Sequence, residues 1–193
     1  MRTRMKKLDI VLASVLILGL IAVAAIARDS TYDSVTDGSD ATVTFGANPH
    51  GMTVVKSVDA KSDETGSAVK IYGRTDKEFP ISTATNGATV IAISNAGTTW
   101  TNADIVVYQH VDGSIDQTTV ASATTSNVTL TAAISSAGAT GDALYKLEQD
   151  YEIPVGVGTA AKEGDIYYSP VDSPVHIVLG SGTNGTLSAT VER

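Results

Sequence analysis

The segment from Asp104 to Val120 reads DIVVYQHVDGSIDQTTV and indicates the fold class. Two runs rich in β-branched and aromatic residues, 104–110 and 115–120, flank the dipeptide Asp112-Gly113. An Asp-Gly pair between such runs is a strong signal for a tight hairpin, because glycine readily adopts the positive φ that the turn requires. The segment therefore predicts two antiparallel strands.

Runs of the same kind recur from residue 41 to the end of the chain, at intervals of about 8–12 residues, with Gly, Asn or Asp turns between them. The first three, 41–45, 52–58 and 68–72, are expected to form a β-meander. About a dozen such runs predict an all-β fold, an antiparallel β-sandwich or barrel. A jelly roll is one arrangement that fits this pattern.

The N-terminal part of the chain has a different character. Residues 10–27 read IVLASVLILGLIAVAAIA without a charged residue, and four basic residues precede them. As an α-helix this segment would be about 27 Å long, close to the ~30 Å core of a bilayer. We therefore expect an N-terminal hydrophobic helix that crosses the membrane, with the basic flank in the cytoplasm and the rest of the chain outside.

The alternative for this segment is a cleaved signal peptide. Ala25-Ile26-Ala27 fits a small-x-small cleavage site, after which the secreted chain would begin at Arg28. A retained helix rich in small residues such as Ala13 and Gly19 could pack closely against other copies in the membrane. Both alternatives put the rest of the chain outside the cytoplasm, at a cell or virion surface if the helix is retained and secreted if the chain is cleaved after Ala27.

Three regions follow from this pattern. Residues 1–28 form the basic flank and the anchor, residues 29–40 (DSTYDSVTDGSD) form an acidic linker without apolar periodicity, and residues 41–193 form the extracytoplasmic β-domain. A division of that domain into two sub-domains near 112–126 is an alternative. The linker aspartates lack the spacing of an EF-hand loop, so a solvated stalk is favoured over a calcium site.

Charge and cysteine content exclude several classes of function. Residues 29–193 contain eight Lys or Arg and twenty Asp or Glu, a net charge of −12. Such a surface repels phosphate backbones, so we expect no nucleic-acid partner. The chain has no cysteine, which excludes disulfides, thiol catalysis and cysteine zinc sites.

We find no motif for catalysis, a metal or a cofactor. His50, His110 and His176 are far apart in sequence and have no carboxylate at a ligand or catalytic spacing, so each is expected to be a half-exposed strand or loop residue. The chain also lacks a nucleophile elbow and a phosphate-binding loop. We therefore predict a protein that is not an enzyme and has no catalytic, cofactor-binding or metal-binding residues.

Two further features have alternative interpretations. Glu148, Asp150 and Glu152 could be paired carboxylates of a glycosidase, but a solvent-facing acidic strand edge is favoured. Trp100 could be an exposed ligand platform, but a core residue at the end of a sandwich is favoured.

A short pattern recurs three times, at 102–108, 141–145 and 164–168. Each segment contains a small residue, an aspartate, apolar residues and a tyrosine. We interpret it as a turn whose aspartate caps the start of a strand that carries a half-buried tyrosine.

The layout, an apolar N-terminal helix followed by an all-β body, resembles that of pilin-like filament subunits and of coat or spike subunits of membrane-containing viruses. The type IV pilin pattern, a glycine before the apolar run and a glutamate at its fifth position, is missing. We predict a structural subunit of a surface assembly that self-associates and contacts the membrane through residues 10–27. The alternative is a tethered or secreted β-sandwich that binds a carbohydrate or protein ligand.

Overall fold

A computed structural model of the chain describes residues 28–35, 40–94, 100–180 and 184–193. These residues contain strands, turns and irregular segments and no helix, which confirms the all-β prediction for this part of the chain. Among them there is no helix of the length and apolarity that crossing a membrane requires. The predicted N-terminal helix at 10–27 lies outside the described residues and stays a prediction.

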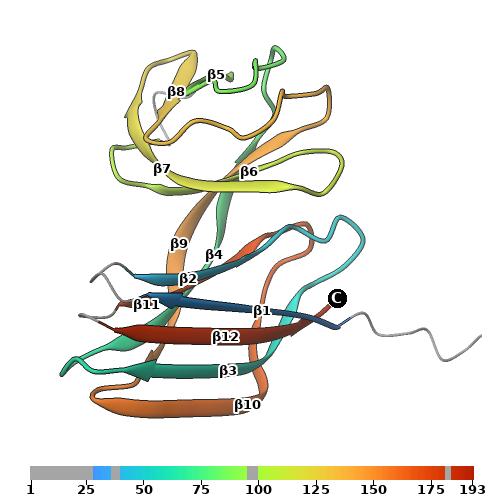
Figure 1. The fold of residues 1–193 in the computed structure, drawn as a ribbon. Coiled ribbons are helices and arrows are strands. Elements are labelled where there is room, and N and C mark those ends of the chain that lie inside the picture. Colours follow the sequence, from blue (N-terminus) through green and yellow to red (C-terminus); the bar gives the residue numbers. More distant parts are fainter. Residues whose placement is uncertain (1–27, 36–39, 95–99, 181–183) are drawn as a thin grey trace, which may run out of the picture.

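The strands form two lobes, one above the other in Figure 1. We define the lower lobe as residues 28–78 and 146–193, and the upper lobe as residues 79–145. Strands β4 (Ala68–Glu78) and β9 (Ala143–Pro154) are long enough to run from one lobe to the other. We use the term waist for the region in which these two strands pass from one lobe to the other.

The lower lobe is an antiparallel β-sandwich. One layer has the strand order β1-β12-β3-β10, and the other has the order β2-β11-β4-β9. The remaining strands of these layers are β1 (Arg28–Val35), β2 (Ala41–Phe45), β3 (Val54–Ser62), β10 (Gly158–Tyr168), β11 (Val175–Gly180) and β12 (Gly185–Glu192). The predicted sandwich is confirmed in this lobe.

In the lower lobe, strands from the N-terminal part of the chain pair with strands from the C-terminal part, starting at the two ends and proceeding toward the middle. β1 pairs with β12, β2 with β11, β3 with β10, and β4 with β9, all antiparallel. The lower lobe is thus one long hairpin folded over itself, and the upper lobe is inserted at the closed end of this hairpin, between β4 and β9. The expected meander is wrong, because β2, β3 and β4 are not neighbours and each pairs with strands from the C-terminal part of the chain.

Alternation of apolar and polar residues along the strands explains why the two sheets pack face to face. β12 alternates between buried and half-buried positions along its whole length, with Leu187, Ala189 and Val191 facing inward. Val43 on β2 and Ile177 on β11 meet them from the opposite layer, in one buried cluster. Because successive side chains of a strand point to opposite faces, this pattern buries one face of each layer and leaves the other polar.

The upper lobe continues the second sheet and has its own core. After β9 the order is β6 (Ile105–Gln109), β7 (Ile115–Ala123), β8 (Asn127–Leu130) and β5 (Val90–Ala92). The predicted hairpin is confirmed: Gln109 pairs with Ile115, and Gly113 has a φ of 90°. Trp100 is 3% exposed within this core, which also confirms its structural interpretation.

Two segments differ in structure from the regions expected for them. Residues 28–35, most of which were assigned to the acidic linker, form β1 and pair with β12 along their length. A strand held through its backbone needs no apolar alternation, so its sequence resembles that of a linker. The range 112–126 lies within the upper lobe, and the chain passes between lobes near residues 78 and 145 instead.

Candidate functional site at the waist

The waist has a cleft of about 390 Å³ with walls from both lobes. Ala47 and Asp172 belong to loops of the lower lobe, whereas His110 and Val111 follow β6 of the upper lobe. The side chains along this cleft form two polar groups, which we name the Asp172 network and the His110 cluster.

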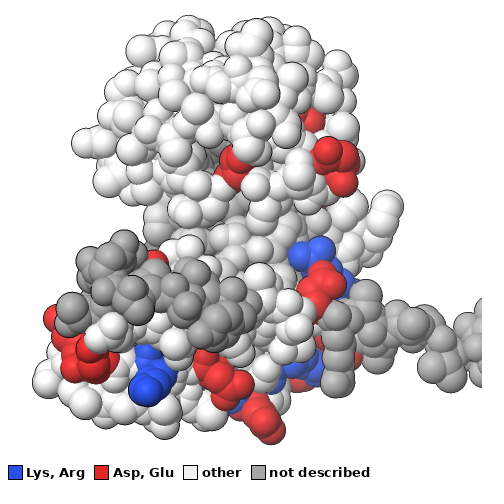
Figure 2. Space-filling view, in the orientation of Figure 1, with Lys and Arg blue, Asp and Glu red and all other residues white. Residues whose placement is uncertain are grey.

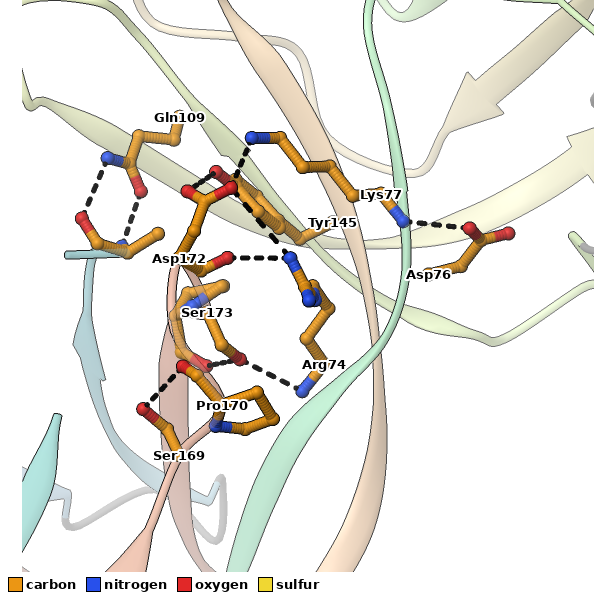
Figure 3. A network of polar contacts seen from close by, with 11 residues as sticks. Arg74, Asp76, Lys77, Gln109, Tyr145, Ser169, Pro170, Asp172 and Ser173 are labelled. Atoms are coloured by element: carbon orange, nitrogen blue, oxygen red, sulfur yellow. Dashed lines mark hydrogen bonds and ion pairs between the residues drawn. The ribbon is translucent and has the colours of Figure 1, made fainter. Parts of the chain in front are cut away.

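The Asp172 network joins β4, β9 and the loop between β10 and β11 (Figure 3). The Asp172 carboxylate accepts a hydrogen bond from the Lys77 ammonium at 2.5 Å and another from the Tyr145 hydroxyl at 3.0 Å. Arg74 donates to the Asp172 carbonyl at 2.9 Å, and its guanidinium is 3.8 Å from the carboxylate. One aspartate thus collects donors from both strands that cross the waist.

Local backbone geometry places this carboxylate. Asp172 has a φ of 55°, a left-handed conformation that aspartate tolerates better than most residues. Its backbone N–H donates to the carbonyl of Asn48 at 3.0 Å, which ties two lower-lobe loops together. Burial and the hydrogen bond to Asp172 raise the pKa of Tyr145, so the phenol stays protonated and remains a donor.

A second contact between the lobes involves backbone groups. The Gln109 side chain accepts from the backbone N–H of Ala47 at 2.5 Å and donates to the carbonyl of Ala47 at 3.2 Å. A small buried cluster that includes Ala47, Val107 and Tyr145 packs beside it. The lobes are therefore joined by polar and apolar contacts in addition to β4 and β9.

The His110 cluster lies on the upper wall of the cleft. The His110 ring is 4% exposed, with Nε2 3.0 Å from a carboxylate oxygen of Asp116 and Nδ1 3.2 Å from one of Asp142. Asp142 also accepts from the Tyr108 hydroxyl at 3.0 Å and from the backbone N–H of Ala139 at 2.8 Å. Both ring nitrogens can donate at once only in the imidazolium form.

Electrostatics shift the pKa values of two groups in this cluster, Asp116 and Tyr108. Burial opposes the charge of Asp116, but hydrogen bonds from Ser135 and His110 outweigh it and lower the pKa of the carboxyl. Burial and the bond to Asp142 raise the pKa of Tyr108. The cluster therefore combines the ionised carboxylate of Asp116 with the protonated phenol of Tyr108, which suits a buried brace between the end of β6 and the start of β9.

The sequence prediction for the histidines is only partly correct. His50 is exposed as expected, but His110 and His176 are buried, and His110 has two carboxylate partners. His176, on β11, is 2.7 Å from the Thr44 hydroxyl through Nδ1, and burial lowers its pKa to about 4. Asp116 and Asp142 lie six and thirty-two residues from His110, so only folding brings them together.

The recurring aspartate–tyrosine pattern was the available signal for part of this site. Asp104 accepts from the backbone N–H of Thr101, and Asp142 accepts from that of Ala139, so both cap turns as predicted. Tyr108 and Tyr145, the tyrosines of the same segments, donate to Asp142 and Asp172. No sequence pattern predicts Asp172 as the partner of Tyr145.

The acidic triplet on β9 lies away from the cleft. Glu148, Asp150 and Glu152 are exposed, as predicted for an acidic edge. Asp150 accepts from the Tyr167 hydroxyl at 2.8 Å. A side chain at Gly73 would meet both groups at 2.4 Å or less, so this pair requires a glycine there.

Charge is distributed unequally between the lobes (Figure 2). No Lys or Arg occurs in the upper lobe, and its four acids are Asp104, Asp112, Asp116 and Asp142. Figure 2 shows an almost uncharged surface over the top of this lobe, while blue and red atoms gather on the lower lobe. The remaining eight basic and sixteen acidic residues of 29–193 belong to the lower lobe.

Among the described residues, no group of three or more His, Asp or Glu side chains has the arrangement of a metal site. No protein-family model matches the chain, and no curated protein matches it in sequence. The comparisons with known proteins therefore give no family and no residue roles.

Comparison with solved structures gives low scores throughout. The crystal structure of PirA has a TM-score of 0.32 and 9% identity, covering 89% of this chain and 99% of that one. The VP16–VP17 complex of major capsid proteins of bacteriophage P23-77 has a TM-score of 0.23 and 9% identity, covering 86% and 100%. VP2 of infectious bursal disease virus has a TM-score of 0.15 and 10% identity, covering 86% and 40%. At these scores none of them informs the function.

Proposed function

We propose that this protein is a non-enzymatic structural subunit of a surface assembly, a coat or spike protein, whose N-terminal apolar segment 10–27 holds it to a membrane. The body would be a jelly roll that carries a second lobe at the closed end of its folded hairpin, between β4 and β9. The pairing of β1 with β12, β2 with β11, β3 with β10 and β4 with β9 supports this topology. Eight-stranded jelly rolls serve as viral capsid and lectin domains.

The saturation of the waist by internal contacts carries the proposal. Lys77, Tyr145 and Asp172 bond to one another, and Gln109 bonds to the Ala47 backbone. His110 faces carboxylates through both ring nitrogens. Groups engaged in this way brace the lobes in one orientation, which a repeating assembly needs, whereas a catalytic site needs groups that turn toward a substrate.

The cleft favours a second candidate, a tethered binding module for a carbohydrate or protein ligand. Its volume of about 390 Å³ is within the range of small-ligand pockets, and it combines apolar side chains such as Val111 with polar ones such as Lys77. A ligand there would have to compete with the internal bonds of the Asp172 network. We rank this candidate second for that reason.

Electron microscopy of the full chain expressed in membranes tests the proposal. Regular arrays or filaments are expected, and Asp172→Ala should reduce their order because the lobes lose their fixed orientation. Asp150→Ala is the matched control, since it removes an exposed carboxylate bonded to a tyrosine away from the waist. Dispersed single copies at high surface density would contradict the structural role, and glycan or protein binding lost on Lys77→Ala would favour the second candidate.

A further inference from the structure

The outer face of the sheet formed by β7, β8 and β5 covers the end of the upper lobe. In Figure 1, β5 and β8 lie at the top, farthest from β10. Val90 pairs with Thr129, and Thr129 pairs with Ser122, so these three side chains share one face. Ile91 and Val128, one position along, are buried on the opposite face. We call the outer face the tip.

The tip is apolar in the middle and rimmed by small polar residues. Val90 is 52% exposed, and Ile81, whose backbone N–H donates to the carbonyl of Ala92 beside it, is 62% exposed. Ser122 and Thr129 supply hydroxyl groups around them. Cores of protein interfaces have this character, since they are depleted of charged residues.

The four acidic side chains of the upper lobe form hydrogen bonds or ion pairs with neighbouring residues of this lobe or of the waist. Asp116 and Asp142 bond to His110 and to backbone N–H groups. Asp104 accepts from Thr101 and from Lys146, and Asp112 from Ser114. Figure 2 shows the top of the lobe without charge in the same orientation.

We propose that the tip is the surface through which the upper lobes of two copies of this chain contact each other. Of residues 29–193, those outside 79–145 include eight basic and sixteen acidic residues, a net charge of −8, so contacts between copies through the lower lobe bring like charges together. Contact through an uncharged end keeps those charges apart, and screening beyond about 8 Å at physiological salt weakens the remaining repulsion. This inference rests on the proposed structural role and names the contact within it.

Cross-linking of the full chain tests the contact directly. The chain has no cysteine, so a single introduced cysteine reports on one position. Ser122→Cys lies on the tip, and Thr65→Cys in the exposed turn between β3 and β4 of the lower lobe is the matched control. A short bis-maleimide reagent is used because a direct disulfide demands a narrow geometry. Cross-linked dimers are expected for Ser122→Cys and not for Thr65→Cys.

Charge substitutions provide the second arm. Val90→Lys places an ammonium at the centre of the tip and should reduce the yield of Ser122→Cys dimers roughly tenfold, because a buried unpaired charge is costly. Val157→Lys is the control, since Val157 is 66% exposed in the turn between β9 and β10 of the lower lobe. It should leave the yield unchanged.

The outcomes separate this inference from the proposed function. Regular assemblies with cross-links at position 65 but none at 122 would overturn the tip contact and leave the structural role intact. Absence of both assemblies and cross-links would overturn both. Equal losses of Ser122→Cys dimers for Val90→Lys and Val157→Lys would also overturn the tip contact. Binding of single copies to glycans or cells, abolished by Val90→Lys, would reassign the tip to a foreign partner.

Discussion

The two lobes are built from similar short strands but differ in how the chain makes them. The upper lobe is one continuous segment, and its strands pair mostly with sequence neighbours, as β6 does with β7 and β7 with β8. The lower lobe joins the two ends of the described chain, with Arg28 opposite Glu192. It also contains all the basic residues of 29–193, whereas the upper lobe has none.

This contrast indicates a division of roles. Each lobe has its own core, and the lobes are joined by β4 and β9, by a small buried cluster and by the polar contacts of the waist. Local pairing forms early and at low entropic cost, whereas the outer strands of the lower lobe must close nearly the whole chain. We expect two units that fold separately and are fixed to each other by the waist.

The largest effect is expected at Asp142 in the upper lobe. Asp142→Ala leaves His110, the Tyr108 hydroxyl and two backbone N–H groups without their buried acceptor, at a cost of about 3–5 kcal/mol. Trp100, the only tryptophan, lies in the upper core and reports on this lobe by fluorescence. Far-UV circular dichroism should show the lower lobe unfolding later; simultaneous loss of both signals would contradict separate units.

The next effect is a pH dependence confined to the lower lobe. The pKa of His176 is lowered by burial from 6.5 to about 4, so between these values the unfolded chain binds the proton and the folded chain does not. Stability should fall as pH decreases through this window, by up to about 3 kcal/mol, and this contribution should level off below pH 4.

The matched variant for this effect is His176→Gln, which cannot take up the proton. Urea unfolding at pH 7.5 and pH 4.5 compares the two proteins, and their difference cancels the titration of the carboxylates. A pH dependence equal in both would show that His176 is not its source.

A smaller effect is expected at the waist. Asp172→Ala leaves Lys77 and Arg74 without their shared anion and Tyr145 without its acceptor, at a cost of about 1–3 kcal/mol. Because the lesion lies between the lobes, hydrogen exchange should rise at the ends of β4 and β9 that cross the waist. Increased exchange throughout one lobe alone would place Asp172 inside that lobe's unit.

Removal of the Tyr145 hydroxyl tests the contribution of one hydrogen bond to the contact between the lobes. Tyr145→Phe deletes the bond to Asp172 and should cost about 0.5–1.5 kcal/mol, with the fluorescence and dichroism transitions moving apart. Tyr167→Phe deletes a similar bond to Asp150 within the lower lobe. That control should destabilise the lower lobe alone, so the dichroism transition should move while the tryptophan transition of the upper lobe stays in place.

The smallest effect is expected at the tip. Val90→Lys replaces an exposed side chain, so thermal unfolding of the full chain at low concentration should change by no more than about 0.5 kcal/mol. A larger loss would show that Val90 supports the upper core.

The site was less predictable from sequence than the strands. The hairpin around Gly113 and the buried position of Trp100 follow from local patterns and are confirmed. Two of the three aspartate–tyrosine segments contain the predicted capped turn, at Asp104 and Asp142, whereas Asp165 lies within β10. The tyrosines Tyr108 and Tyr145 are buried and not half-buried as expected. His110 was misjudged because its partners come from another strand and another turn, and no spacing rule identifies such neighbours.

The all-β class follows from the sequence alone, because period-2 alternation and turn residues act over a few neighbouring positions. So does the charge contrast, since no Lys or Arg occurs between Lys77 and Lys146. The order of the strands in the two sheets, in contrast, is visible only in the folded chain. Strand pairing uses backbone groups that every residue carries, so the pairing of β1 with β12 and the insertion of a lobe between β4 and β9 depend on long-range closure of the chain.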